Sequence, residues 1–382
     1  MAWELSEEHE AFRKTVAEFA QHEVAPKAAD FDAAGQIPTS LVHAMGDLGL
    51  FGVVFPESVG GGGGDFTALC VAIEELGRVD QSVGITLSAG VGLGANPIYS
   101  FGSQEQQERW LPDLLSGRAL GAFGLTEPDG GSDAGATKTK ARLDPQSDEW
   151  IIDGSKSYIT NSGTAITSII TVTARDEDGS ISSYVVPSGT PGLTVEPAPF
   201  KLGWHASDTH DLSLAAVRIP RSHLLGEAGQ GFRQFLRILD DGRIAIAALA
   251  LGLARGCLDI ALDYAKQRNA FGSAIGSFQG LAFQLSDLAV KVENITNLTY
   301  KAAWLKDQGR PFAQAAAMAK LYSSEAAVDA TRLATQTLGG AGFMESSPVA
   351  RFYRDAKILE IGEGTSEIQR LVIARSLGLE VR

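Results

Sequence analysis

Residues 150–161 read Trp-Ile-Ile-Asp-Gly-Ser-Lys-Ser-Tyr-Ile-Thr-Asn, and Thr, Ser, Val, Ile and Gly dominate the chain from about residue 121 to residue 226. Short apolar runs in this block, such as Ile169 to Val172 and Tyr184-Val185-Val186, are separated by Gly, Pro and Asp. Short runs of β-branched and aromatic residues between turn residues are typical of strands. The middle of the chain therefore predicts a β domain of short strands.

The chain before this block, from residue 5 to about residue 116, has the pattern of helices. Phe12, Val16 and Phe19 recur at helical spacing. The run Gly60 to Gly64 lacks the Lys-Ser or Lys-Thr pair that follows the glycines of a phosphate-binding P-loop. We expect this run to be a connecting loop between helices.

The chain after the block, from residue 231 onward, predicts long helices again. One seam alternates steps of four and three residues, which is typical of a packed helical bundle. It consists of Leu281, Leu285, Leu288, Val292 and Ile295. The order helix, strand, helix without alternation argues against a Rossmann sheet. We therefore predict three domains, at residues 1–120, 121–228 and 229–382.

The composition argues against several kinds of partner. The 382 residues carry a net charge of −14, and an acidic surface repels both nucleic acid and anionic membranes. The longest apolar run, Ile244 to Ala254, is about half the length that spans a bilayer. An acidic protein can still bind an anionic ligand where a few basic residues line a cleft. We expect neither a nucleic-acid nor a membrane partner.

The cysteines and the N-terminus indicate the compartment. Cys70 and Cys257 lie in apolar stretches with a helical pattern, where buried free thiols are expected rather than a disulfide or a metal site. The N-terminus is acidic and lacks the basic and apolar regions of a signal peptide. These features predict a cytoplasmic protein without a metal site.

Five segments stand out along the chain as rich in residues that bind ligands. They are Phe123-Gly-Leu-Thr-Glu-Pro-Asp-Gly-Gly-Ser-Asp133, Gly154 to Asn161, Arg268-Asn-Ala-Phe-Gly272 with Phe278-Gln279, Gln336-Thr-Leu-Gly-Gly340, and Arg354-Asp-Ala-Lys357 with Glu360-Ile-Gly-Glu-Gly-Thr-Ser-Glu-Ile-Gln-Arg370. The first of these alone would indicate only a turn. Together, in this order and spacing, they closely resemble the acyl-CoA dehydrogenase family, of the short-chain, medium-chain or short-branched-chain type.

The resemblance covers essentially the whole chain and has consequences for fold and assembly. It implies an N-terminal helical domain, a middle β-barrel or β-sandwich domain and a C-terminal four-helix bundle. This is the order of blocks that the composition indicates independently. It also implies an FAD cofactor and a homotetramer.

The resemblance implies that one chain supplies part of its own flavin site. The matching positions in the first two segments and in the last are Phe123, Leu125, Thr126, Ser132, Tyr158, Thr160, Thr365 and Glu367. Small residues and backbone N–H groups near Thr126 can approach the isoalloxazine edge, and the Thr160 hydroxyl can reach flavin N5. The family often has Trp where this chain has Tyr158, and Tyr keeps an aromatic face for stacking.

Two further groups match positions that reach the FAD of a neighbouring subunit. They are Arg268, Phe271, Phe278 and Gln279 in one group and Gln336, Gly339 and Gly340 in the other. Arg268 suits a pyrophosphate because its fork pairs with two oxygens. Each has a plainer alternative: core aromatic residues for Phe271 and Phe278, a surface charge for Arg268, and a helix C-cap for Gly339-Gly340.

Glu363 matches the catalytic base of the family. The alternative is a carboxylate that complements the dipole of the helix that follows it. Some members carry the base instead on the helix that contains Asp240 and Arg243, directly before that arginine, where this chain has Gly242. The empty second position favours Glu363. Asp240 and Arg243 match residues that contact the CoA arm, with an exposed helix-side ion pair as the alternative, and Ser132 and Gly364 are also expected at the substrate.

The implied reaction is α,β-dehydrogenation of an acyl-CoA to a trans-2-enoyl-CoA. Glu363 would remove the α proton with a pKa raised by desolvation, and flavin N5 would accept the β hydride. In the family the backbone N–H of the base and a flavin ribityl hydroxyl stabilise the enolate. Electron-transfer flavoprotein is the expected acceptor.

Two rival functions remain open at this point. An acyl-CoA oxidase would use oxygen as acceptor, although such enzymes are usually longer. A flavin-containing scaffold without turnover would not need Glu363. The acyl group is also open, because Gly362 stands where many relatives have Tyr. The missing ring indicates a wider pocket and a branched or bulkier acyl group.

Overall fold

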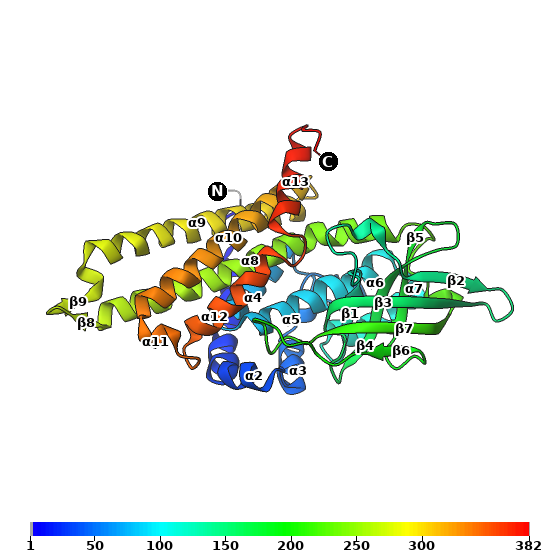
Figure 1. Cartoon of the computed structure of the whole chain (residues 1–382), viewed down its shortest axis with the longest axis horizontal. Coiled ribbons are helices and arrows are strands. Elements are labelled where there is room, and N and C mark those ends of the chain that lie inside the picture. The colour runs from blue at the N-terminus through cyan, green and yellow to red at the C-terminus, as the bar shows by residue number, and fades with distance from the viewer. Residues whose placement is uncertain (1–2, 382) are drawn as a thin grey trace.

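The computed structural model describes residues 3–381, with helical parts at both ends of the chain and a sheet between them (Figure 1). The N-terminal helices are α1 (Glu7–Phe19), α2 (Ala28–Ala34), α3 (Thr39–Asp47), α4 (Phe66–Gly77), α5 (Gln81–Ala89), α6 (Asn96–Phe101) and α7 (Gln104–Leu115). Capping residues fix their starts, since the Asp65 side chain accepts from Ala68 N–H at the head of α4. The run Gly60 to Gly64 is a loop, as predicted.

The middle of the chain forms one twisted sheet of seven strands in the order β1-β4-β2-β3-β7-β6, with β5 paired to β4. The strands are β1 (Leu120–Gly124), β2 (Lys140–Asp144), β3 (Glu149–Thr160), β4 (Thr167–Arg175), β5 (Ile181–Pro187), β6 (Leu193–Val195) and β7 (Thr209–Pro220). The register of β3 against β7 shifts between Lys156 and Ile159, and Tyr158 in that bulge has a φ of 62°. Bulges of this kind turn a side chain away from the regular pleat.

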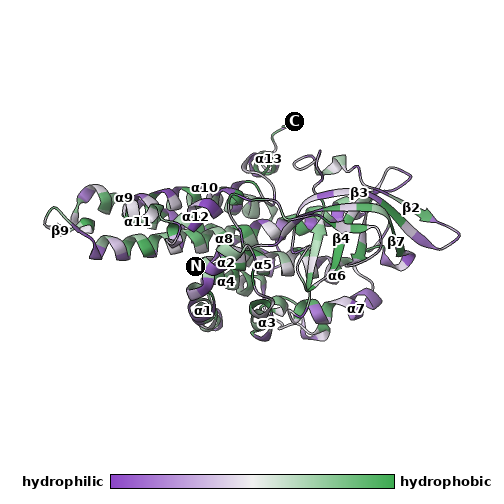
Figure 2. Ribbon diagram, turned by 60° about the horizontal axis from the view of Figure 1, so that its bottom comes forward, coloured by the Kyte–Doolittle hydropathy of each residue, from purple (hydrophilic) through white to green (hydrophobic). Residues whose placement is uncertain are grey.

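The C-terminal part contains the long helices that the sequence predicts. They are α8 (Gly231–Gln267), α9 (Gln279–Asp307), α10 (Ala313–Leu338), α11 (Gly340–Phe343), α12 (Pro348–Ala356) and α13 (Ser366–Ser376), with the hairpin β8 (Asn269–Ala270) and β9 (Ser273–Ala274) between α8 and α9. In the predicted seam of α9, Leu285, Leu288, Val292 and Ile295 are buried and Leu281 is partly buried. Figure 2 shows hydrophilic turns on α1 and α7 and hydrophobic residues along the strands.

Helix α8 is the axis of the helical part. By length and composition it could cross a membrane, but 78% of its most apolar window is buried inside the protein. The core helix of a folded domain has the same composition because it is apolar all round. Cys257 on α8 and Cys70 on α4 are buried free thiols, which confirms the prediction for both.

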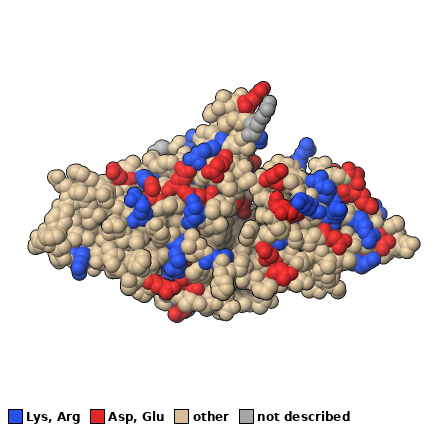
Figure 3. Space-filling view, viewed as in Figure 1, with Lys and Arg blue, Asp and Glu red and all other residues tan. Residues whose placement is uncertain are grey.

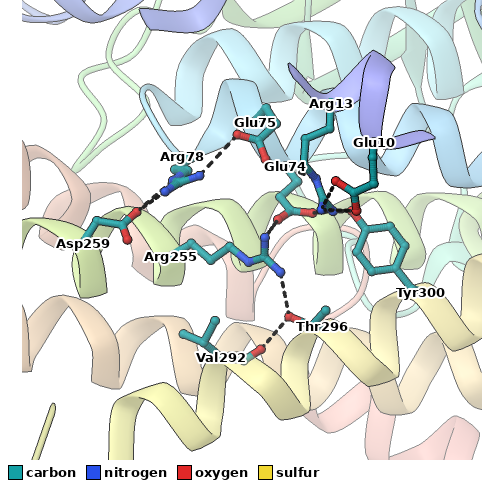
Figure 4. Close-up of polar contacts among 10 residues, drawn as sticks. All are labelled: Glu10, Arg13, Glu74, Glu75, Arg78, Arg255, Asp259, Val292, Thr296 and Tyr300. Carbon is teal, nitrogen blue, oxygen red and sulfur yellow. Dashed lines mark hydrogen bonds and ion pairs between the residues drawn. The ribbon is translucent and has the colours of Figure 1, made fainter. Parts of the chain in front are cut away.

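A buried charge network ties the N-terminal helices to α8 and α9 (Figure 4). Glu74 on α4 is fully buried and pairs with Arg255 of α8 at 2.7 Å and with Arg13 of α1 at 3.5 Å. The Tyr300 hydroxyl of α9 donates a hydrogen bond to the same carboxylate. Because buried charges are costly unless they are paired, this network favours one relative placement of these helices.

Candidate active site

A cavity of about 1260 Å³ lies where the N-terminal helices, the sheet and α8 meet. The space-filling view shows a hollow at the centre of the face seen in Figure 1, with charged side chains of both signs on its rim (Figure 3). Ligand pockets for one small molecule usually occupy about 300–1,000 Å³. The cavity is therefore large enough for a cofactor and a substrate together.

The cavity wall brings together residues that the sequence assigns to one site. Of the predicted site residues, those that line it are Phe123, Leu125, Thr126, Ser132, Tyr158, Thr160, Asp240, Glu363, Gly364 and Thr365. They come from the end of β1 and the loop after it, the end of β3, the N-terminal third of α8 and the loop before α13. Segments more than 200 residues apart in the chain thus converge on one chamber.

Glu363 lies in the loop between a short 3-10 turn (Lys357–Glu360) and α13, with a φ of 54°. The residue as a whole is partly exposed because it forms cavity wall, yet its Oε2 atom is enclosed and has no hydrogen-bond partner among residues 3–381. A Cβ atom added at Gly242 of α8 would lie 2.6 Å from that oxygen. The glycine at the alternative base position therefore provides the space that the Glu363 carboxylate occupies.

The environment of Glu363 makes its carboxylate a stronger base than an ordinary glutamate. Desolvation raises its pKa, and the positive charges of Lys320 and Arg243 offset only part of that rise. A carboxylate oxygen that is enclosed and unpartnered can accept a proton from a ligand without first losing a protein hydrogen bond. The arrangement fits general-base chemistry at the cavity wall.

Two buried side chains that the sequence reasoning missed hold the loop that carries Glu363. Lys320 Nζ on α10 donates to the Gly364 carbonyl at 2.7 Å, and Gln369 Nε2 on α13 donates to the same oxygen at 2.8 Å. Both side chains are fully buried. The signal that could have revealed Lys320 is a lysine on the alanine-rich, core-facing side of a helix, where a charge is costly unless it has a function.

Asp240 and Arg243 form an ion pair one turn apart on α8. Asp240 lines the cavity, whereas Arg243 is buried behind it. Burial raises the pKa of Asp240 and lowers the pKa of Arg243, and the charge of each partner counteracts the shift of the other. The alternative was an exposed ion pair on the side of the helix. The ion pair is present, but it is not exposed, because Arg243 is buried near Glu363.

The sheet side of the cavity begins at β1. The Phe123 ring stacks on Phe235 of α8 with 5.8 Å between centroids. The loop after β1 is anchored from below, because Lys156 Nζ donates to the Leu125 carbonyl at 3.2 Å and pairs with Glu127 at 2.7 Å. These buried contacts keep the loop carrying Thr126 and Ser132 at the cavity edge.

Tyr158 is the most unusual residue on this side. Its side chain is 70% exposed although it lines the cavity, and its backbone is held in the left-handed region by a hydrogen bond from its N–H to Asp211 Oδ1 at 2.9 Å. Non-glycine residues in this conformation concentrate at functional sites. Thr160, two residues on, lines the same wall at the end of β3.

The remaining predicted site residues do not line the cavity. Arg268, Phe271, Phe278 and Gln279 lie at the hairpin between α8 and α9, and Gln336, Gly339 and Gly340 lie where α10 meets α11. Both groups are exposed and lie toward the end of the bundle away from the sheet (Figure 1). The alternative that Phe271 and Phe278 are core residues is wrong, since they are 98% and 38% exposed.

Capping roles explain part of two predicted motifs. Gly339 has a φ of 59° and is the C-cap of α10. Thr365 lines the cavity but its side chain also accepts from Ile368 N–H as the N-cap of α13, and Glu367 lies in the exposed first turn of that helix. A capping role does not exclude ligand contact, because the cap fixes where the remaining backbone N–H groups point.

Comparison with known proteins gives a consistent result along the whole chain. Family models match as the acyl-CoA dehydrogenase N-terminal domain at residues 6–118, the middle domain at 122–217 and the C-terminal domain at 229–378. "Probable acyl-CoA dehydrogenase YngJ" of Bacillus subtilis is 49% identical over 99% of this chain and 100% of its own length. The mitochondrial short-chain specific acyl-CoA dehydrogenase of Mus musculus is 45% identical over 98% of this chain and 91% of its own.

Solved structures agree with the sequence comparison. Butyryl-CoA dehydrogenase from Megasphaera elsdenii superposes with a TM-score of 0.95 at 40% identity, covering 98% of this chain and 99% of that one. A chain in a structure described as the electron transferring flavoprotein of Acidaminococcus fermentans has the same TM-score and identity and covers 99% of both chains. The protein is an oxidoreductase that belongs to the acyl-CoA dehydrogenase family.

Proposed function

We propose that this protein is an FAD-dependent dehydrogenase that converts a short-chain acyl-CoA to the trans-2-enoyl-CoA, with Glu363 as the catalytic base. The observation that carries the proposal is the enclosed, unpartnered Oε2 of Glu363 at the wall of a cavity of about 1260 Å³. Its raised pKa makes the carboxylate a better proton acceptor than a solvated one.

The cavity residues suit a flavin. Proteins of this family bind FAD, and the sheet side of the cavity offers an exposed aromatic ring at Tyr158 and hydroxyls at Thr126, Ser132 and Thr160. A ring can cover a flat heterocycle, and hydroxyls and loop N–H groups can serve its polar edge. Bound FAD would supply the acceptor for the β hydride. Phe123 and Leu125 would complete the apolar wall beside it.

The rest of the flavin contacts would come from a second copy of the chain. The predicted contacts at the α8–α9 hairpin and at the α10–α11 junction are exposed, as residues awaiting a partner subunit must be. Phe271, 98% exposed, is an unfavourable surface residue unless another chain covers it. This exposure supports the homotetramer expected from the resemblance.

The chain's own groups would act on the α carbon in a defined order. The Glu363 carboxylate would take the α proton, because Glu363 lines the cavity and its Oε2 has no hydrogen bond to the described residues that would compete. The backbone N–H of Glu363 would donate to the thioester oxygen, and the contacts to the Gly364 carbonyl would fix where that N–H points. Asp240 and Gly364, both in the wall, would meet the thioester and the CoA arm, with Arg243 supporting Asp240 from behind.

The short-chain assignment rests on the relatives. Gly362 indicates in addition that the acyl group can be wider than a straight short chain. A Cβ at Gly362 would meet no heavy atom closer than 3.5 Å, so a larger side chain would fit there and its absence leaves space beside the base. We therefore expect butyryl-CoA to react and a branched short acyl-CoA to be accepted as well. A panel of straight, branched and aromatic acyl-CoA thioesters, scored by flavin reduction, ranks these groups.

Electron-transfer flavoprotein is the acceptor that we propose. A structural neighbour comes from work on such a flavoprotein, and the resemblance implies the same partner. Turnover that depends on added electron-transfer flavoprotein, with little peroxide formed in air, supports this acceptor. Stoichiometric peroxide without it would identify an oxidase instead.

The test of the proposed function is an anaerobic titration of the purified flavoprotein with butyryl-CoA. We expect the flavin absorbance band to bleach in proportion to thioester added, with enoyl-CoA as product. A flavin that stays oxidised with every thioester of the panel would indicate a scaffold without turnover.

A further inference from the structure

Lys320 is a buried lysine that the proposed reaction does not use directly. It lies on α10 among the buried residues Ala316, Ala317 and Ala319, and its side chain has no exposure. The hydrogen bond of its ammonium group among residues 3–381 goes to the Gly364 carbonyl at 2.7 Å. A fully buried ammonium is costly, so its position next to the catalytic loop requires a physical reason.

A second buried lysine, also among residues 3–381, shows what a purely structural arrangement looks like. Lys156 in the sheet is also fully buried, but it pairs with the Glu127 carboxylate at 2.7 Å. Burial lowers the pKa of Lys156 to about 8, and its partner's charge counteracts that shift. Lys320 instead bonds to a neutral carbonyl, which leaves its charge available to a carboxylate farther away.

Glu363 is the carboxylate whose charge acts most strongly on Lys320. Desolvation lowers the pKa of Lys320 to about 8, and the positive charge of Arg243 on α8 adds to this lowering. The negative charge of Glu363 opposes the lowering most strongly, and Glu360 and Glu367 oppose it less. Conversely, Lys320 is the strongest of the charges that lower the pKa of Glu363. These groups come from α8, the turn before the loop, the loop itself and α13.

The contacts of Lys320 also determine where the base sits. Its ammonium and the Gln369 amide both donate to the Gly364 carbonyl, and Gln369 also donates to the Glu363 carbonyl at 3.3 Å. The loop is left-handed at both positions, with φ values of 54° at Glu363 and 90° at Gly364. Glycine adopts a positive φ freely, but at Glu363 this conformation is strained and persists only where the surrounding contacts hold it.

We propose that Lys320 is a positioning residue for the base: it anchors the backbone that carries Glu363 and supplies the buried positive charge that keeps the Glu363 carboxylate ionised at working pH. The proposal rests on the proposed role of Glu363. Lys320 does not line the cavity.

The test is the pH profile of kcat for the holoenzyme with butyryl-CoA in wild type and Lys320→Met. Loss of a positive charge near an acid raises the pKa of that acid. The acid limb of kcat, where Glu363 becomes protonated, should therefore move upward by about one pH unit in Lys320→Met. At a pH on the acid limb of both enzymes, the fraction of plateau kcat that the variant retains should be about tenfold smaller than that of wild type.

A matched control separates charge from mechanical support. Ser324 lies one turn along α10 and donates from its hydroxyl to the Leu359 carbonyl at 2.8 Å, holding the same segment without a charge. Ser324→Ala should lower the thermal midpoint without moving the acid limb. Lys320→Gln, which keeps a donor but not the charge, should shift the limb as the Met variant does and carries the test if that variant fails to fold.

An acid limb at the wild-type pH in folded Lys320→Met or Lys320→Gln would overturn the role of Lys320. So would an equal shift in Ser324→Ala. A wild-type protein that reduces flavin while the variants show no shift leaves the proposed function intact. A wild type that never reduces flavin overturns both, so the two failures are distinguishable.

Discussion

Two glutamates lie in the interior of this protein in opposite arrangements. Glu74 is fully buried and is surrounded by Arg13, Arg255 and Tyr300, which pair with it directly (Figure 4). Glu363 forms part of a cavity wall, and its enclosed Oε2 has no partner among the residues that the structure describes. One carboxylate is paired with positive neighbours, whereas the other has an enclosed oxygen without a hydrogen-bond partner in the described part of the chain.

The contrast shows that the placement of the countercharge, rather than burial alone, distinguishes a structural glutamate from a reactive one. Paired charges at contact distance stabilise one packing of the helices and leave nothing to react. Around Glu363 the positive groups act from behind the loop, since Lys320 bonds to a backbone carbonyl and Arg243 to Asp240. The carboxylate is thereby partly stabilised, while its enclosed Oε2 makes no hydrogen bond to the described residues.

The largest effect should come from Glu363→Gln. The amide keeps the shape but cannot accept the α proton, so we expect kcat to fall by about 10²–10⁴-fold. Measured flavin content and the thermal midpoint should stay close to wild type, because the lost carboxylate made no hydrogen bond through Oε2. Near-normal turnover would remove Glu363 from the mechanism.

Glu74→Gln is the same substitution in the other arrangement and should give the reverse outcome. The substitution leaves Arg255 without its carboxylate partner, whereas Arg13 keeps Glu10 and Glu75. Removal of one partner from a buried ion pair costs about 3–5 kcal/mol of stability. We expect a lower urea midpoint and an unchanged kcat per folded flavoprotein. If stability held and kcat collapsed, the division between the two glutamates would be wrong.

Gly242→Ala probes the space beside the base. The added methyl would lie 2.6 Å from Glu363 Oε2, and the next nearest side-chain atoms belong to the same glutamate. The carboxylate must move, and displacement of a reacting group by about 1 Å can cost about 10²-fold in rate. Because alanine is the better helix former, stability should not decrease. Full activity would show that the two positions do not compete for space.

The smallest effect belongs to the exposed half of the predicted flavin site. Arg268→Ala should reduce the FAD retained per chain a few-fold, through loss of a charge-assisted contact to the pyrophosphate. The ratio of flavin to protein absorbance after purification measures this. Lys266→Ala, an exposed change two residues earlier on α8, is the control. Equal FAD content in both variants would argue against an inter-subunit role for Arg268.

Most of the fold follows from patterns local in sequence. The helical seam on α9 and the β texture around Trp150 each reflect a periodicity that a single element imposes, and the structure has both. The sequence motifs also identified residues that the structure places around one cavity, including Thr126, Tyr158 and Glu363. Phe271, by contrast, is exposed in the hairpin between α8 and α9. Whether another chain covers it cannot be derived from the periodicity of a single helix or strand.

Lys320 shows a second limit of sequence reasoning. Its hydrogen bond reaches Gly364, which lies 44 residues further along the chain. Only the packing of α10 against the loop before α13 brings the two together. Its position in an alanine-rich helix signals that it is unusual, but not which group it serves. Long-range polar contacts of this kind have to be found in the structure.

Proton exchange at the α carbon tests the role of Glu363 most directly. The substrate analogue 3-thiabutyryl-CoA has sulfur at the β position, so it can lose an α proton but no β hydride. In D₂O the wild-type flavoprotein should exchange the α hydrogens of this thioester for deuterium, as followed by NMR, and Glu363→Gln should not. Exchange at the wild-type rate in folded, FAD-containing Glu363→Gln would contradict the account, because another group would then be the base.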